Sequence, residues 1–161
     1  MATREISKSV PGILRPFKAF VQDLGLKDGD QIVYFGCVGT CTPFVELNAV
    51  AVRGLHVEQV FVPLLDVAKA QKIQFVEDVG MQVSGGPATL HPNLLVFMGG
   101  LAMPLMPVTK EQVRDLAAKY PDAKVAGVCF MSMFEKAGWL DTVPFDLMID
   151  ATLDPVVITR R

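Results

Sequence analysis

Three cysteines are the residues of this sequence with the clearest chemical potential. Cys37 and Cys41 lie in the stretch GCVGTCT, and Cys129 lies near the end of a run without charge. A helix start favours the thiolate of a cysteine just ahead of it, so Cys41, and after it Cys37, are candidate nucleophiles or redox thiols. All three could instead ligate a soft metal or an iron–sulfur cluster, although three thiolates leave a tetrahedral shell incomplete. The remaining alternative is that they are small core residues.

Glycines and hydroxyl residues in the same stretch indicate a second kind of chemistry. Gly36, Gly39, Thr40 and Thr42 precede a helix that we expect to begin at Pro43, with Thr42 as its cap. Glycines let backbone N–H groups approach a ligand, and helix starts attract anions, so the stretch is a candidate site for a phosphate-containing ligand.

Comparison with known phosphate loops gives only partial matches. The end of the stretch is similar to the hydroxyl-lined loop of flavodoxins. The stretch has no third glycine for a dinucleotide fingerprint and no lysine for a P-loop. Cysteine phosphatases place an arginine after their nucleophile, and none stands between Cys37 and Glu46.

A second stretch, MGGLAMPLMPVT from Met98 to Thr109, is rich in methionine and has no charge before Lys110. Gly99 and Gly100 could bring the backbone close to a ligand opposite the cysteine loop. Loops normally face water, so something must cover this one. We expect a homo-oligomer, most simply a dimer, to cover it, with a cofactor wall as the alternative.

Carboxylates and histidines add little to the candidate site. Asp66 and Asp150 follow predicted strands and could be a general base or a metal ligand, and Asp66 could equally cap a helix. His56 and His91 fall at the opposite ends of the predicted strands. Without a histidine or a lysine beside the cysteines, thiol-based hydrolysis has no evident general base. The sequence therefore assigns no reaction and no cofactor.

Apolar spacing and turn residues predict the elements that position these side chains. Residues 10–24 repeat apolar side chains at helical spacing, with Pro16 in the first turn and Gly25 as the stop. Thr109 and Gln112 form a capping-box pattern for a helix that runs to about Tyr120. The other expected helices are 43–53, 66–72 and 132–138, and the expected strands are 31–35, 57–62, one within 73–83, 94–98, 124–130, 145–149 and an edge strand at 156–159.

This alternation of uncharged strands and amphipathic helices predicts an α/β fold. We expect a three-layer sandwich around a mostly parallel sheet of about five strands, flavodoxin-like or Rossmann-like. Ligands bind such sheets beyond the carboxyl ends of the strands, where the glycine and cysteine loops fall.

Composition limits the classes of function. The chain has 161 residues, which is typical of one domain, so we expect a single α/β domain. A formal net charge of −2 offers no basic surface for nucleic acid, and no window of about 20 apolar residues predicts a membrane span. With three cysteines and no signal-peptide pattern, we expect a cytoplasmic protein.

Three stretches together resemble a known family. CTPFVELNAVAVR, GMQV at Gly80 to Val83, and LLVFMGGLAMP are similar to an uncharacterised family of small archaeal proteins, mainly from methanogens, catalogued as a domain of unknown function. The resemblance extends over nearly the whole chain. It implies the cytoplasm of strict anaerobes, where free thiols and oxygen-sensitive metal centres survive, and it carries no known activity or catalytic residue.

The leading hypothesis is therefore a small-molecule or anion-binding domain whose ligand lies between the loop Gly36 to Thr42 and the loop Gly99 to Met106. One alternative is a thiol-dependent redox or metal protein that uses the three cysteines. Another is a noncatalytic homo-oligomeric module.

Overall fold

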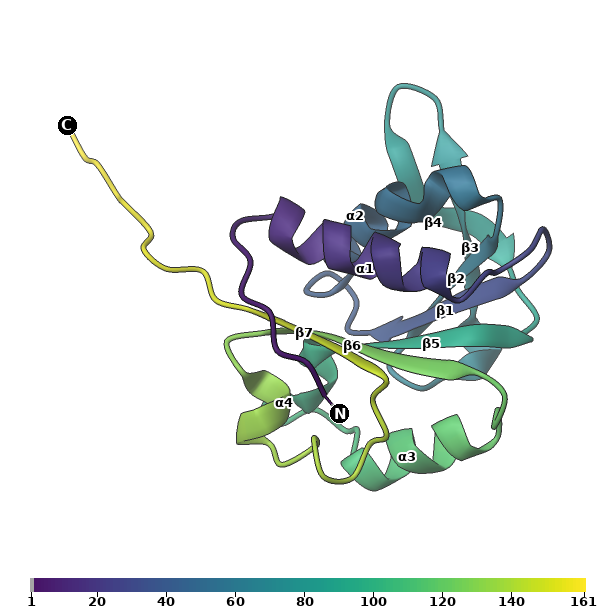
Figure 1. Ribbon diagram of the computed structural model, residues 1–161. Helices are drawn as coiled ribbons and strands as arrows, with labels where there is room; N and C mark the ends of the chain where they lie inside the picture. The colour runs from purple at the N-terminus through teal and green to yellow at the C-terminus, as the bar shows by residue number, and fades with distance from the viewer. Residues whose placement is uncertain (1) are drawn as a thin grey trace.

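A single sheet organises the protein, and the computed structural model describes residues 2–161 of it (Figure 1). Seven strands make the sheet in the order β4-β3-β2-β1-β5-β6-β7. Their bounds are β1 (Gln31–Gly36), β2 (Glu58–Pro63), β3 (Gln71–Val76), β4 (Gly80–Pro87), β5 (Pro92–Met98), β6 (Lys124–Phe130) and β7 (Leu147–Ala151).

Five of the strands run parallel, and their order is that of a flavodoxin-like fold. Read along the chain, β1, β2, β5, β6 and β7 take the spatial order 2-1-3-4-5. The two additional strands, β3 and β4, form a hairpin that joins the edge of β2 in antiparallel orientation. The predicted α/β class is confirmed, but the sheet has seven strands instead of five because residues 71–87 form this hairpin.

Helices cover the two faces of the sheet and complete the three layers (Figure 1). Helices α1 (Pro11–Asp23) and α2 (Thr42–Val52) lie on one face. Helix α3 (Lys110–Ala118), the short α4 (Met133–Lys136) and the 3-10 turn η3 (Gly99–Ala102) lie on the other. Each face has its own apolar core, so the central strands β1 and β5 are buried on both sides.

Helix α1 follows its predicted signal at one end only. Helix α1 ends before Gly25, which takes a left-handed φ of +63° as the predicted stop requires. It begins at Pro11, however, so Pro16 lies inside the helix and the prediction that Pro16 falls in the first turn is wrong. Two further 3-10 turns, η1 (Arg53–Leu55) and η2 (Val67–Lys69), follow α2 and β2.

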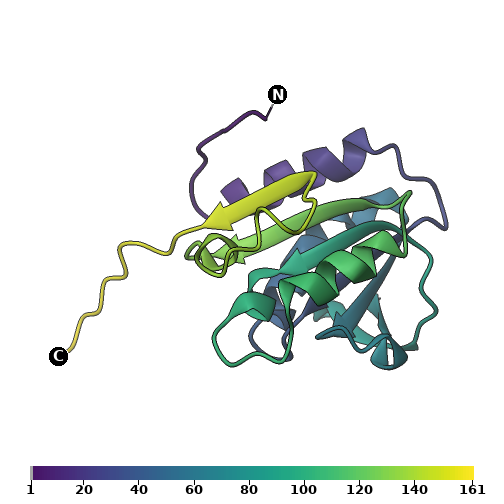
Figure 2. The ribbon, with the colours of Figure 1, turned by 90° about the horizontal axis from the view of Figure 1, so that it is seen from below.

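Two sequence predictions at the sheet margins are wrong. The expected helix at 66–72 is only the turn η2, because β3 begins at Gln71 and pairs with β2. The expected strand at 156–159 is absent from the described chain. Residues 152–161 instead leave β7 as an extended tail that runs away from the body of the molecule (Figure 2).

Within residues 2–161, the protein has no helix that is both long and apolar enough to cross a membrane.

Candidate functional site

The cysteine loop and the methionine-rich loop meet at the carboxyl ends of β1 and β5. These strands are parallel neighbours, but the chain leaves β1 toward α2 on one face and leaves β5 through η3 toward α3 on the other. This is the switch point of the sheet, where doubly wound folds bind their ligands. The predicted meeting of the two loops is confirmed.

Cys37 and Cys41 form the contact between the two loops. Both are buried, and the Cys41 N–H donates to the Cys37 carbonyl oxygen at 3.0 Å, which closes one turn ahead of α2. The Cys37 Sγ lies 3.2 Å from the carbonyl oxygen of Gly100 and 3.5 Å from the Sδ of Met106. Burial, together with the neighbouring Cys41 thiol, raises the pKa of Cys37 from 9.0 to about 11, so Cys37 is a neutral thiol at physiological pH.

Cys129 lies in the other core and does not join this pair. It packs with the α3 and α4 face, while Cys37 and Cys41 pack with the α1 and α2 face. Its Sγ accepts the Phe134 N–H at 3.3 Å, and burial raises the pKa of its thiol. Among the described residues, no three His, Cys, Asp or Glu side chains gather as a metal site would require. The proposed three-cysteine metal site is therefore not formed, because the sheet separates its members.

Three of the predicted ligand-binding glycines lie against cysteine sulfur. A Cβ on Gly36 would come 2.7 Å from the Cβ of Cys41, and a Cβ on Gly99 would come 2.7 Å from the Sγ of Cys129. A Cβ on Gly100 would overlap the Sγ of Cys41. These positions lack a side chain because the two loops and the sheet pack closely around the thiols.

The fourth glycine, Gly39, has a different role. Its φ of +81° is left-handed, and a Cβ there would meet no atom within 4 Å. Gly39 therefore serves the turn itself. Its N–H donates to the Oγ1 of Thr42 at 3.2 Å.

The helix start holds fewer free donors than the sequence predicts. Thr42 is the first residue of α2 and Cys41 takes the cap position without a side-chain cap bond, so the prediction that Thr42 caps the helix is wrong. The N–H groups of Gly39 and Cys41 are both used within the loop. Val38, Gly39 and Thr40 are exposed at its tip.

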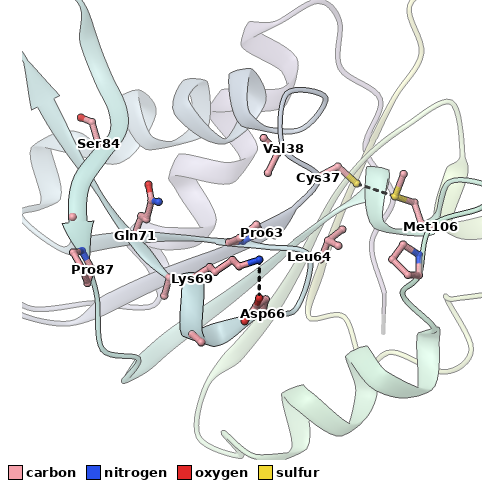
Figure 3. Close-up of a pocket in the computed structure, with 14 residues that line it drawn as sticks. Cys37, Val38, Pro63, Leu64, Asp66, Lys69, Gln71, Ser84, Pro87 and Met106 are labelled. Carbon is pink, nitrogen blue, oxygen red and sulfur yellow. Dashed lines mark hydrogen bonds and ion pairs between the residues drawn. The ribbon is translucent and has the colours of Figure 1, made fainter.

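A large hollow opens on one side of the contact between the loops, and we call it the edge hollow (Figure 3). Its volume is about 950 Å³. The cysteine loop, the end of β2, the turn η2, the β3–β4 hairpin and the methionine-rich loop all contribute to it. Its lining includes Cys37, Val38, Pro63, Leu64, Asp66, Lys69, Gln71, Ser84, Pro87 and Met106.

Charge enters the edge hollow at η2. Lys69 Nζ and Asp66 Oδ2 are 3.3 Å apart, and both side chains are substantially exposed. Figure 3 shows this pair below Val38 and below Pro63 at the end of β2. Asp66 is thus paired with Lys69 and makes no side-chain cap bond. Lys69 lies in the turn that follows β2, the parallel neighbour of β1, so η2 reaches the same end of the sheet as the cysteine loop.

A smaller hollow of about 270 Å³ opens on the other side of the contact, and we call it the methionine hollow. Cys41, Thr40, Gly99 and Gly100 form part of its wall. Four methionines, two phenylalanines and two aliphatic residues form the rest: Met98, Met103, Met131, Met133, Phe44, Phe130, Val128 and Leu153. The rings of Phe44 and Phe130 are tilted by 44° with their centroids 4.3 Å apart, and the sequence alone indicated a site role for neither.

The methionine-rich loop is covered mainly by its own chain. Met98, Leu101 and Ala102 are buried, and Met103 and Met106 pack against the α1 and α2 core. Leu105 is fully exposed at the tip of the loop, next to the exposed Pro104. The loop therefore supplies walls of both hollows and exposes only its tip.

The remaining candidates have structural partners. Asp150 accepts the N–H and the hydroxyl of Ser132 at 3.0 and 2.8 Å, which fixes the left-handed turn before α4. His91 lies 3.2 Å from the carbonyl oxygen of Gly29, at the amino ends of the strands, and His56 ends η1 in a left-handed conformation. Both histidines thus lie at the amino ends of the strands, at the opposite end of the sheet from the cysteine loop, as predicted.

Comparison with known proteins places this arrangement in a family. The family model described as "Uncharacterized protein conserved in archaea (DUF2124)" matches residues 8–154. An uncharacterised protein of Methanocaldococcus jannaschii is 37% identical over 86% of this chain and 82% of its own. One from Methanothermobacter thermautotrophicus is 34% identical over 90% of this chain and 97% of its own.

A crystal structure of a protein of unknown function from Methanothermobacter thermautotrophicus has the same fold. It superposes with a TM-score of 0.82 at 31% identity and covers 99% of both chains. The resemblance found in the sequence is thus confirmed over most of its length. The chain belongs to the DUF2124 family of uncharacterised archaeal proteins.

Proposed function

We propose that this protein binds a small organic molecule with an anionic group, such as a phosphate ester, in the edge hollow. The observation that carries the proposal is the position of this hollow at the switch point of a flavodoxin-like sheet, with a lysine in its lining. In such sheets the crevice beyond the strand ends is the place where ligands bind.

The size and lining of the edge hollow suit a ligand of this class. Small-molecule sites have volumes of about 300 to 1,000 Å³ and are mostly apolar with a few polar groups. Val38, Leu64 and Met106 offer apolar surface, while Ser84 and Gln71 offer hydroxyl and amide groups. A ligand with an apolar body and a polar end matches both kinds of group.

Lys69 is the group that we expect to meet the anion. Its ion pair with Asp66 is exposed, and exposed pairs contribute little because water screens them. A bound phosphate or carboxylate can therefore replace Asp66 as the partner of Lys69 at small cost. Lys69 supports the proposal better than the start of α2, where the N–H groups of Gly39 and Cys41 are already bonded.

Thiol chemistry ranks second among the candidate functions. The contact of Cys37 with Cys41 favours it, because two neighbouring thiols could form a disulfide. The raised pKa of Cys37 disfavours it, since the thiolate is the reactive form. All three cysteines are free, which agrees with a reducing compartment and with the proposed cytoplasmic location.

Thermal unfolding with a ligand panel tests the proposal. The panel pairs apolar molecules that carry a phosphate or a carboxylate with neutral analogues, and it includes inorganic phosphate. A ligand at about 100 times its Kd stabilises a protein by about 2.7 kcal/mol, which raises Tm by several degrees. We expect an anionic member to do this while its neutral analogue does not.

Two lysine variants make the test specific. Lys69→Gln should weaken binding about tenfold, as loss of one charged contact does. Lys18→Gln removes the same charge from the exposed surface of α1 and should leave binding unchanged. The proposal fails if no anionic compound stabilises the protein, or if Lys69→Gln and the wild type respond alike.

A further inference from the structure

The C-terminal tail, residues 152–161, is apolar and uncovered. Leu153, Val156, Val157 and Ile158 are 61%, 72%, 83% and 75% exposed. The tail runs away from the sheet in both views (Figures 1 and 2). Three consecutive β-branched side chains held in water lose the stabilisation that burial would give, so a segment of this kind is expected to lie against another surface.

A third hollow lies where the tail begins, and we call it the arm hollow. Its volume is about 690 Å³, and it separates the N-terminal arm, residues 2–10, from β7 and the first residues of the tail. Apolar walls come from Ile6 and Val10 of the arm and from Phe44 and Phe130. The apolar tail is thus uncovered and the apolar arm hollow beside its first residues is empty.

The charges of the two surfaces are complementary. The tail ends in Arg160 and Arg161. The arm hollow is lined by Glu5 and Asp150, and no Lys or Arg is found among the described residues that line it. A tail that places its apolar residues in the hollow can therefore bring its arginines to an acidic surface.

The relative of known structure supports an ordered tail. Its crystal structure aligns over 99% of both chains, so the aligned region extends into residues 152–161. β7 is also an edge strand, and no strand formed by residues 2–161 lies on its outer side. An extended, β-branched segment suits that position, because an unpaired edge accepts a further strand.

We propose that the occupant of the arm hollow is the tail of a second copy of this chain, in a two-fold dimer that exchanges tails. In this dimer, each tail fills the arm hollow of the other copy, so both arm hollows are occupied and both tails are covered. A two-fold dimer of this kind is closed, because the same surface is used on both copies. Ten extended residues reach about 33 Å, enough to cross from one copy to the other. Val156, Val157 and Ile158 occupy the partner's arm hollow.

Sedimentation equilibrium of matched variants tests the dimer. The wild type sediments as a dimer, and Val157→Asp weakens dimerisation about 100-fold or more, as loss of a central apolar anchor does. Val79→Asp, at the exposed tip of the β3–β4 hairpin, is the control and leaves the dimer unchanged. A wild-type monomer, or a Val157→Asp dimer as tight as the wild type, overturns the proposal.

Mixing two defective variants tests the exchange itself. Ile6→Asp spoils the arm hollow and Val157→Asp spoils the tail, so each variant alone dimerises weakly. In an equal mixture, one heterodimer arrangement retains an intact tail in an intact hollow and recovers dimerisation at lower concentration than either variant alone. A mixture that dimerises no better than its components overturns exchange, as a tail folded onto its own body would give that result.

Discussion

At the scale of single residues, the thiols and the glycines around them determine the geometry of the site. Gly36 and Gly100 contact the side chain of Cys41 from two directions, and the Cys37 Sγ lies 3.2 Å from the Gly100 carbonyl oxygen. These contacts hold the cysteine loop against the methionine-rich loop. The boundary between the edge hollow and the methionine hollow therefore depends on four small residues.

Gly100→Ala should destabilise the protein by about 1 to 3 kcal/mol, because the added methyl overlaps the Cys41 sulfur and overpacking has costs of that size. Cys41→Ala removes that sulfur, so the double variant should be more stable than the sum of the single effects predicts. Gly54→Ala is the control, because a Cβ there meets no atom within 4 Å. Urea unfolding of the wild type and of all four variants gives these stabilities, and simple additivity of the Gly100→Ala and Cys41→Ala effects would contradict the packing account.

Cys37 should make stability fall with pH in a defined window. Its pKa is raised from 9.0 to about 11 in the folded protein, so folding favours the neutral thiol. The stabilisation is complete below pH 9 and is lost as pH rises toward 11, because the thiolate is tolerated better in the unfolded chain.

The measurement compares urea unfolding of the wild type and of Cys37→Ser between pH 8 and pH 11. The wild type should lose more stability over this range than the serine variant, whose hydroxyl does not ionise. The same neutral thiol should resist alkylation at pH 8 in the folded protein. Parallel pH profiles, or fast alkylation of Cys37, would contradict a buried neutral thiol and would favour the thiol alternative.

At the scale of elements, the capping box of α3 is a local feature that the sequence predicted and the structure confirms. Thr109 Oγ1 accepts the Gln112 N–H at 3.2 Å, and Gln112 Oε1 accepts the Thr109 N–H at 2.9 Å. Thr109→Ala should reduce the free energy of unfolding by about 1 kcal/mol. Thr89→Ala should change it by less than about 0.5 kcal/mol, because Thr89 contributes through its backbone carbonyl. Equal effects would contradict the capping role.

The parallel strands were predictable because their signals are local. Residues 31–36 are buried along their whole length, as an uncharged run of β-formers indicates. The sequence did not predict the β3–β4 hairpin, because apolar and polar residues do not alternate regularly along it. Phe75 is exposed, and Ile73 is buried among polar neighbours. The hairpin is held by pairing with β2, which is a tertiary contact.

The sequence predicted where the candidate site lies but only some of the residues that form it. The sequence placed both loops at one edge of the sheet, since they follow parallel strands. It could not place Cys129 on the opposite face, because one residue of register decides the face of a strand side chain. Lys69 was missed because residues 66–72 were expected to form a helix, whereas Lys69 lies in the short turn η2 directly after β2.

At the scale of the whole molecule, the edge hollow unites elements that are distant in the sequence. The hairpin occupies the connection between β2 and β5, and with η2 and the two loops it encloses the space beyond the strand ends. The proposed dimer contact lies at the other edge, by β7, so ligand binding and tail exchange use separate surfaces. A variant can therefore lose ligand binding and keep the dimer, or lose the dimer and keep ligand binding.

Native mass spectrometry tests the proposed ligand site most directly, on protein purified without oxygen and compared with its denatured mass. Ala68→Trp fills the edge hollow from η2, and Ala137→Trp adds the same side chain to an exposed position after α4. We predict an additional mass on the wild type and on Ala137→Trp that is lost on denaturation and absent from Ala68→Trp. A bare protein in all three, or an additional mass that Ala68→Trp retains, would contradict a ligand in the edge hollow.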